Sequence, residues 1–136
     1  MKTKTLPILT IGATLVACHH DDYLPTNEQV SKRFQAFESH PDEKALRGFL
    51  NLRPDGEVCY LHIALTGKAF ALHPQLFETV AANIGTEMER RSFRQLADLG
   101  NGVFEYYPEH KPKSFDGVFA KSGWLKSHRS QPSKDD

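Results

Sequence analysis

The 136-residue sequence has little cysteine and no excess of charge of either sign. Two cysteines are too few for the disulfide scaffolds that hold many small secreted domains together. Lysine and arginine number 17, and so do aspartate and glutamate. This balance argues against a dedicated nucleic-acid-binding protein, which normally carries a basic excess. The length and the 39% hydrophobic content are instead typical of a single globular domain.

The sequence also lacks the short motifs of the common enzyme classes. It has no G-x-S-x-G nucleophile turn, no H-E-x-x-H zinc motif and no glycine-rich phosphate loop. Catalytic groups can assemble from distant positions, so this lack excludes no enzyme, but no residue is marked as catalytic. The sequence therefore predicts a binding protein without cofactor or metal, rather than an enzyme.

A short apolar segment follows a positively charged start. Lys2 and Lys4 precede residues 6–17, which carry no charge and are rich in leucine and isoleucine. The segment has the length of the hydrophobic region of a signal peptide, whereas a transmembrane helix needs about 20 apolar residues. We therefore expect residues 1–17 to be a signal peptide that is cleaved off.

This segment ends in Leu15-Val16-Ala17-Cys18, which resembles the lipobox of bacterial lipoproteins. The resemblance implies that the Cys18 thiol receives a diacylglyceryl group and that a signal peptidase cuts before Cys18. It further implies that the new amino group is acylated, with fatty acids such as palmitate. Two or three acyl chains anchor a protein that one chain holds only weakly. The alternative is an ordinary secretory signal with an incidental cysteine, and the resemblance implies nothing about the domain behind residue 18.

The residues after Cys18 bear on the location of the mature chain. In enteric lipoproteins an aspartate next to the cysteine commonly marks retention in the inner membrane. His19 therefore implies the periplasmic side of the outer membrane, with the inner membrane as the alternative. Residues 18–25 form a short polar tether, whose adjacent histidines and aspartates rarely converge on a metal without a fold to hold them. The mature chain keeps 15 basic and 17 acidic residues, because only Lys2 and Lys4 are removed.

We expect one domain over residues 26–125, and its sequence contains signals for where helices begin and end. Thr26 and Gln29 fit a capping box, and apolar residues follow at helical spacing up to Phe37. A second helix is predicted after Pro41, whose ring suits a first helical turn. A central helical segment is predicted over residues 74–100, with an interruption at Gly85.

Strands are predicted on either side of this central segment. Residues 57–65 alternate with a period of two, which is typical of a strand with two different faces. The other predicted elements are a hairpin turn at 66–68, its returning strand at 69–72, and strands at 103–107 and 115–119. The sequence thus predicts a small single-domain α+β fold, with two N-terminal helices, an antiparallel sheet and a disordered polar tail over residues 126–136.

Cys59, His62 and His73 are the candidates for chemistry. In the predicted strand, Cys59 faces the core and His62 lies on the opposite face, so the two make a poor catalytic pair. His62 would instead meet His73 across the hairpin, with Tyr60 nearby. This pair supports the alternative function, a small periplasmic enzyme or a small-ligand binder that uses His62 and His73.

Four residues are candidates for contact with a protein partner. Arg90 and Arg94 share one face of a predicted helix, and Tyr106 and Tyr107 lie in a segment rich in aromatic side chains, which interfaces favour. We therefore predict an anchored periplasmic protein that acts by protein–protein binding. It would be either an accessory subunit of an envelope or secretion machine, or an immunity-type inhibitor of a toxic enzyme.

Overall fold

The computed structural model describes residues 24–131, which form seven α-helices and two short 3₁₀ helices and contain no β-strand. The elements are α1 (Asn27–Ser39), α2 (Glu43–Leu50), α3 (Val58–Leu72), α4 (Pro74–Ala81), α5 (Glu87–Leu99), η5 (Gly100–Phe104), η6 (Pro108–His110), α6 (Phe115–Lys121) and α7 (Trp124–His128). The predicted α+β fold with an antiparallel sheet is therefore wrong, and the described domain is all-α. Cys18 and the predicted signal peptide lie outside the described residues.

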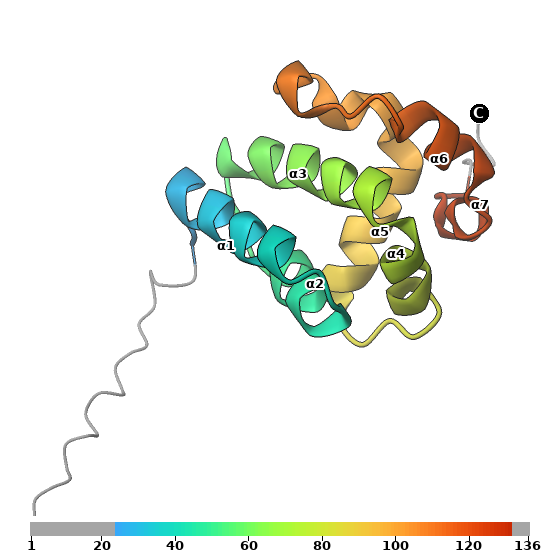
Figure 1. Cartoon of the computed structure of the whole chain (residues 1–136), viewed down its shortest axis with the longest axis horizontal. Helices are drawn as coiled ribbons and strands as arrows, with labels where there is room; N and C mark the ends of the chain where they lie inside the picture. The colour runs from blue at the N-terminus through green and yellow to red at the C-terminus, as the bar shows by residue number, and fades with distance from the viewer. Residues whose placement is uncertain (1–23, 132–136) are drawn as a thin grey trace, which may run out of the picture.

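Helix α3 is the central element, around which the other helices are arranged (Figure 1). It contacts α1, α4, α5, α6 and both 3₁₀ helices, and nine of its 15 residues are buried. A helix that is apolar on all sides is typical of such a buried position. The same apolar run predicted a strand, because periodicity cannot distinguish a buried strand from a buried helix.

Gly67 lies in the middle of α3 and not in the predicted hairpin turn. A Cβ atom at Gly67 would lie 2.7 Å from Cγ2 of Val103 and 3.0 Å from the ring of Phe104. The glycine therefore lets η5 pack directly against the backbone of α3. The strand predicted at 103–107 belongs to η5 and the turn after it, and the strand predicted at 115–119 belongs to α6.

The structure confirms the predicted start of the first helix. The hydroxyl of Thr26 accepts a hydrogen bond from the amide of Gln29 at 3.2 Å, and the Gln29 side chain accepts one from the Thr26 amide at 2.8 Å. The carboxylate of Asp42 caps α2 in the same way, 2.7 Å from the amide nitrogen of Ala45. Pro74 occupies the first turn of α4. Local capping chemistry thus fixes where these helices begin.

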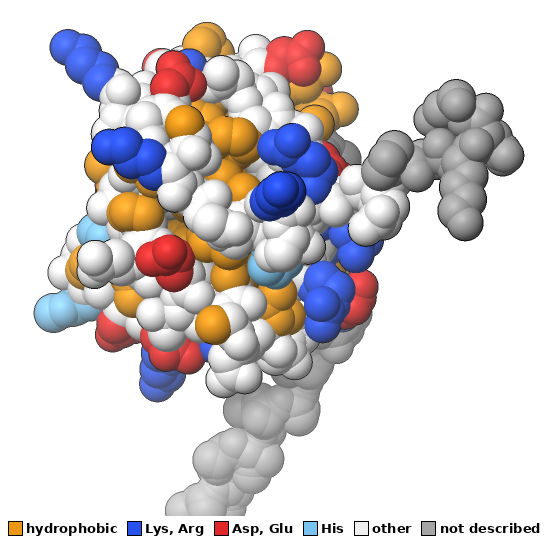
Figure 2. Space-filling view, turned by 90° about the vertical axis from the view of Figure 1, so that its right-hand side faces the viewer, with side chains coloured by type: hydrophobic (Ala, Val, Ile, Leu, Met, Phe, Trp, Pro, Cys, Tyr) orange, Lys and Arg blue, Asp and Glu red, His pale blue; other side chains and the backbone are white. Residues whose placement is uncertain are grey.

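Helices α4, α6 and α7 close the aromatic core on one side. Figure 2 shows that side, where apolar side chains lie between those of lysine and arginine. Ordered structure continues beyond residue 125, since α7 ends at His128 and Ser130 donates two hydrogen bonds to the Asp98 carboxylate, from its amide at 2.8 Å and its hydroxyl at 2.6 Å. These two donors hold the pKa of Asp98 below its ordinary value.

Candidate functional site

The rings of two exposed tyrosines contact each other where α3 begins, inclined by 35°. The ring centroids of Tyr60 and Tyr106 are 4.3 Å apart, and the two residues are 44% and 58% exposed. Exposed aromatic side chains are enriched at the centres of protein interfaces, because each combines a large apolar area with a polar group. We name the two tyrosines and the neighbouring Glu57, Glu105 and Glu109 the tyrosine surface.

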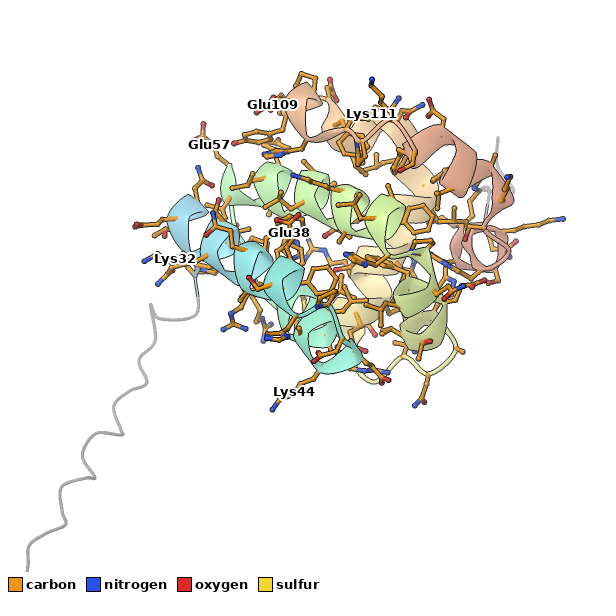
Figure 3. All side chains as sticks on the ribbon, in the orientation of Figure 1. Lys32, Glu38, Lys44, Glu57, Glu109 and Lys111 are labelled. Atoms are coloured by element: carbon orange, nitrogen blue, oxygen red, sulfur yellow. The ribbon has the colours of Figure 1, made fainter. Side chains whose placement is uncertain are left out.

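The tyrosine surface carries negative charge around its rings. The carboxylate of Glu105, followed by Tyr60, raises the pKa of Tyr106 above its ordinary value. Glu57 and Glu109 lie at the same end of the molecule (Figure 3), and α3 contacts η6, which contains Glu109. The tyrosine surface therefore suits a partner that presents a flat or apolar side chain surrounded by basic ones.

The four predicted partner-binding residues differ in exposure and lie on different elements of the structure. Tyr106 is exposed, whereas Tyr107 is half-buried against the core, with its ring 6.0 Å from that of His110. Arg90 and Arg94 are exposed on α5, and Arg90 lies 3.6 Å from Glu87. Within residues 24–131, no hydrogen bond, ion pair or ring contact joins either arginine to either tyrosine.

Sequence reasoning missed Tyr60 as the partner of Tyr106. The predicted strand placed Tyr60 beside His62 and His73, whereas the first turn of α3 turns its ring towards the segment after η5. The sequence predicted that one of Tyr106 and Tyr107 points away from the core because it placed both in a strand; Tyr106 is exposed although the strand is absent. The identity of the exposed one follows from the fold.

The two candidate histidines do not meet, because the hairpin that would pair them is a single helix. Nε2 of His62 lies 2.8 Å from the carbonyl oxygen of Phe49, and the two rings stack at 4.6 Å. His73 follows the last residue of α3 and packs edge-on against Phe37, at 5.3 Å between ring centroids. Eleven residues of helix separate the histidines by about 16 Å.

Cys59 and His62 lie one helical turn apart, and not on opposite faces as the predicted strand required. The Cys59 thiol lies 3.3 Å from the carbonyl oxygen of Pro54, to which it donates. The opening beside Cys59, His62 and Arg91 has a volume of about 10 Å³, which is no more than one water needs. The arrangement therefore offers no room for a substrate.

The burial of His62 predicts a pH-dependent stability. Burial lowers the pKa of His62, while its hydrogen bond to Phe49 opposes this and Arg91 adds to it. Below pH 6.5 the unfolded chain binds a proton at His62 that the folded chain excludes, so the free energy of unfolding falls by up to about 1.4 kcal/mol per pH unit. Above that pH this contribution is constant. Urea unfolding at a series of pH values measures the slope.

His62→Gln is the matched control for this slope. Glutamine retains a donor for the Phe49 carbonyl but has no proton to gain, so the variant should lose this part of the pH dependence. An unchanged slope in His62→Gln would assign the pH dependence to other groups.

Glu89 is the buried charge that the sequence did not reveal. One oxygen of its carboxylate accepts hydrogen bonds from Nη1 of Arg47 at 2.7 Å and from the amide of Gly85 at 2.8 Å. The other oxygen accepts from Nδ2 of Asn51 at 2.8 Å, and Oδ1 of Asn51 accepts from the hydroxyl of Thr86. The network fixes α2 to the start of α5. It is structural, because each carboxylate oxygen is bound to a neighbouring segment.

None of the helices within residues 24–131 is long and apolar enough to span a bilayer. The same part of the chain contains no group of three or more histidine, cysteine, aspartate or glutamate side chains that could hold a metal ion. No protein-family model, no curated protein and no solved structure matches the chain.

Proposed function

We propose that the chain is a lipid-anchored protein of the bacterial envelope that works by binding another protein through the tyrosine surface. The observation that carries this proposal is the contact between the tilted rings of Tyr60 and Tyr106, both of which are exposed. Leaving such rings in water forgoes stabilisation that burial would give, and an interface recovers it. The two rings already touch, so a partner would meet them side by side.

The predicted lipid anchor at Cys18 supports this proposal independently of the tyrosine surface. The lipobox-like segment ending in Cys18 would hold the mature domain at a membrane, and His19 favours the outer membrane. A tethered domain meets membrane-bound partners at a raised effective concentration, so a modest interface suffices. Both an accessory subunit of an envelope machine and an immunity-type inhibitor would use such an arrangement.

The charges of the tyrosine surface narrow the class of partner. Glu57, Glu105 and Glu109 are exposed around the rings. Tyrosine faces attract arginine and lysine side chains, and nearby carboxylates reinforce this attraction. The partner that fits the tyrosine surface is therefore one whose contact patch combines basic side chains with a flat or apolar one.

One set of cell-fractionation and co-purification measurements tests both halves of the proposal. We expect the tagged wild-type chain in the membrane fraction, with an N-terminal mass that shows acylated Cys18. Cys18→Ser should be released from that fraction. Tyr106→Ala should remain membrane-bound but lose at least tenfold of its co-purified partner, since interface tyrosines commonly contribute 2 kcal/mol or more.

Leu72→Ala is the matched control for the partner measurement. Leu72 is 44% exposed at the opposite end of α3, so its truncation removes a similar exposed apolar side chain outside the tyrosine surface. Equal capture by the wild type and Tyr106→Ala would contradict the tyrosine surface. A soluble wild-type chain with an intact Met1 would contradict the anchor.

A further inference from the structure

A groove lined by basic side chains lies where the described chain enters the domain. It is open to solvent, with a volume of about 530 Å³, between α1 and the segment that follows α2. Its lining residues are Pro25, Gln29, Lys32, Arg33, Ala36, Asn51, Leu52 and Arg53. We name it the entry groove, and Figure 3 shows Lys32 at this end of the molecule.

The lining of the entry groove carries three cations and no carboxylate. Lys32, Arg33 and Arg53 are all exposed. Lys32 has Glu28 at 3.9 Å, an exposed pair that leaves the lysine open to other anions. Within residues 24–131, neither Arg33 nor Arg53 forms an ion pair with a carboxylate. The groove therefore suits an anionic ligand.

The walls of the entry groove are fixed by the fold. The guanidinium of Arg33 lies against α2, where a Cβ atom at Gly48 would be 3.4 Å from its Nη1. Asn51, in the floor, is bound to Arg47, Glu89 and Thr86. The network around Glu89 therefore holds the backbone at Asn51, two residues before Arg53.

The position of the groove in the chain points to the source of the anion. Six residues lie between Cys18 and Pro25, and the seven steps from one to the other span about 25 Å when the chain is fully extended. If Cys18 is acylated, the groove cannot lie farther than that from the bilayer surface. Cations so close to anionic headgroups contribute about fivefold each to membrane affinity.

We propose that the entry groove binds the phosphate of an anionic phospholipid headgroup and so docks the domain on the membrane. This inference deepens the proposed function and rests on its lipid anchor for the position of the groove. Docking would orient α1 towards the bilayer.

The test measures binding of the unlipidated chain from His19 onward to vesicles. The core residues all lie between Val30 and Leu125, so this chain keeps the core whole. We expect it to bind vesicles of phosphatidylglycerol mixed with phosphatidylcholine, and not vesicles of phosphatidylcholine alone. The double variant Arg33→Gln, Arg53→Gln should bind the mixed vesicles about 25-fold more weakly.

A control variant with the same charge change separates the groove from net charge. Lys121→Gln, Lys126→Gln removes two exposed cations from α6 and α7, on the far side of the molecule from α1 (Figure 1). It should bind mixed vesicles as the wild type does. Equal losses in the two double variants would overturn the proposal, because they would reduce it to an effect of overall charge.

Two further experiments test whether the entry groove binds something other than a phospholipid. Binding of inorganic phosphate by a chain that does not bind the mixed vesicles would assign the groove to a soluble phosphate. Vesicle binding that appears only after Asp21→Asn, Asp22→Asn would show that the chain's own carboxylates occupy the groove of the unmodified chain. Either result overturns the lipid proposal for the unmodified chain. Because the chain tested has no acyl groups, none of these outcomes depends on whether Cys18 is acylated in cells.

Discussion

Replacing Glu89 with alanine should lower the free energy of unfolding by about 3–5 kcal/mol, which is the usual cost of removing one partner from a buried ion pair. Glu89 is 2% exposed, and its carboxylate accepts hydrogen bonds from Arg47, Asn51 and Gly85. Without it, these donors lose their acceptor in a site that water reaches poorly. Domains of this size are stable by about 5–15 kcal/mol, so the loss is a large fraction of the total.

The exposed neighbour Glu87 supplies the matched control. Its side chain is 83% exposed and lies 3.6 Å from Arg90, so Glu87→Ala should cost less than about 0.5 kcal/mol. Glu89→Gln keeps the size and shape of the side chain but replaces one accepting oxygen with an NH₂ donor. Its cost in free energy of unfolding should therefore fall between those of the two alanine variants. Urea denaturation monitored by circular dichroism measures all three. Equal costs for Glu87→Ala and Glu89→Ala would show that the network contributes nothing to stability.

The helices that could be predicted are those whose ends carry their own chemistry. Thr26 with Gln29, Asp42 and Pro74 are local signals, and the helices begin where these residues indicated. α3 has no side-chain cap and is apolar all round, so neither a start signal nor a polar face marked it as a helix. In its place, Gly67 was interpreted as a turn. Its reason, the close approach of Val103, lies 36 residues away along the chain.

In the candidate site too, the features that depend on contacts between distant residues could not be predicted from the sequence. The exposure of one of the two adjacent tyrosines was inferred from a predicted strand, in which neighbouring side chains point to opposite faces, and that strand is absent from the described residues. The contact between the rings of Tyr106 and Tyr60 could not be predicted, since it depends on α3 being a helix. The sequence marks Glu89 as the capping-box partner of Thr86, and the Glu89 amide does donate to the Thr86 hydroxyl, but the sequence does not reveal the burial of its carboxylate. Its burial depends on Arg47, which comes from a separate helix 42 residues earlier.

Replacing Phe70 with alanine should cost about 3–5 kcal/mol and release the C-terminal helices from the core. Phe70 is fully buried in α3. Its ring meets those of Phe77 and Trp124 edge-on at 5.6 Å, Phe115 at 6.0 Å and Phe119 at 6.3 Å. Truncation would leave a cavity among four aromatic rings that cannot all move to fill it.

The C-terminal helices depend on this contact more than the rest of the fold does. α6 and α7 have seven and five residues, lengths at which an isolated helix does not form in water, so tertiary packing must hold them. Trp124, the only tryptophan in the chain, lies in α7 against Phe70 and reports on the contact through its fluorescence. In Phe70→Ala, its emission should shift to the red at a lower urea concentration than in the wild type.

Phe70→Leu keeps most of the volume and should cost less than half as much as Phe70→Ala, with the tryptophan emission in water unchanged. Leu72→Ala, on the exposed side of α3, should have little effect on either measurement. A Phe70→Ala variant that loses less than about 1 kcal/mol would contradict the burial of this ring. In the predicted returning strand, residues 70 and 72 would share a face and the two alanine variants would behave alike, whereas in α3 they differ. Comparing them therefore tests the helical structure of the central segment directly.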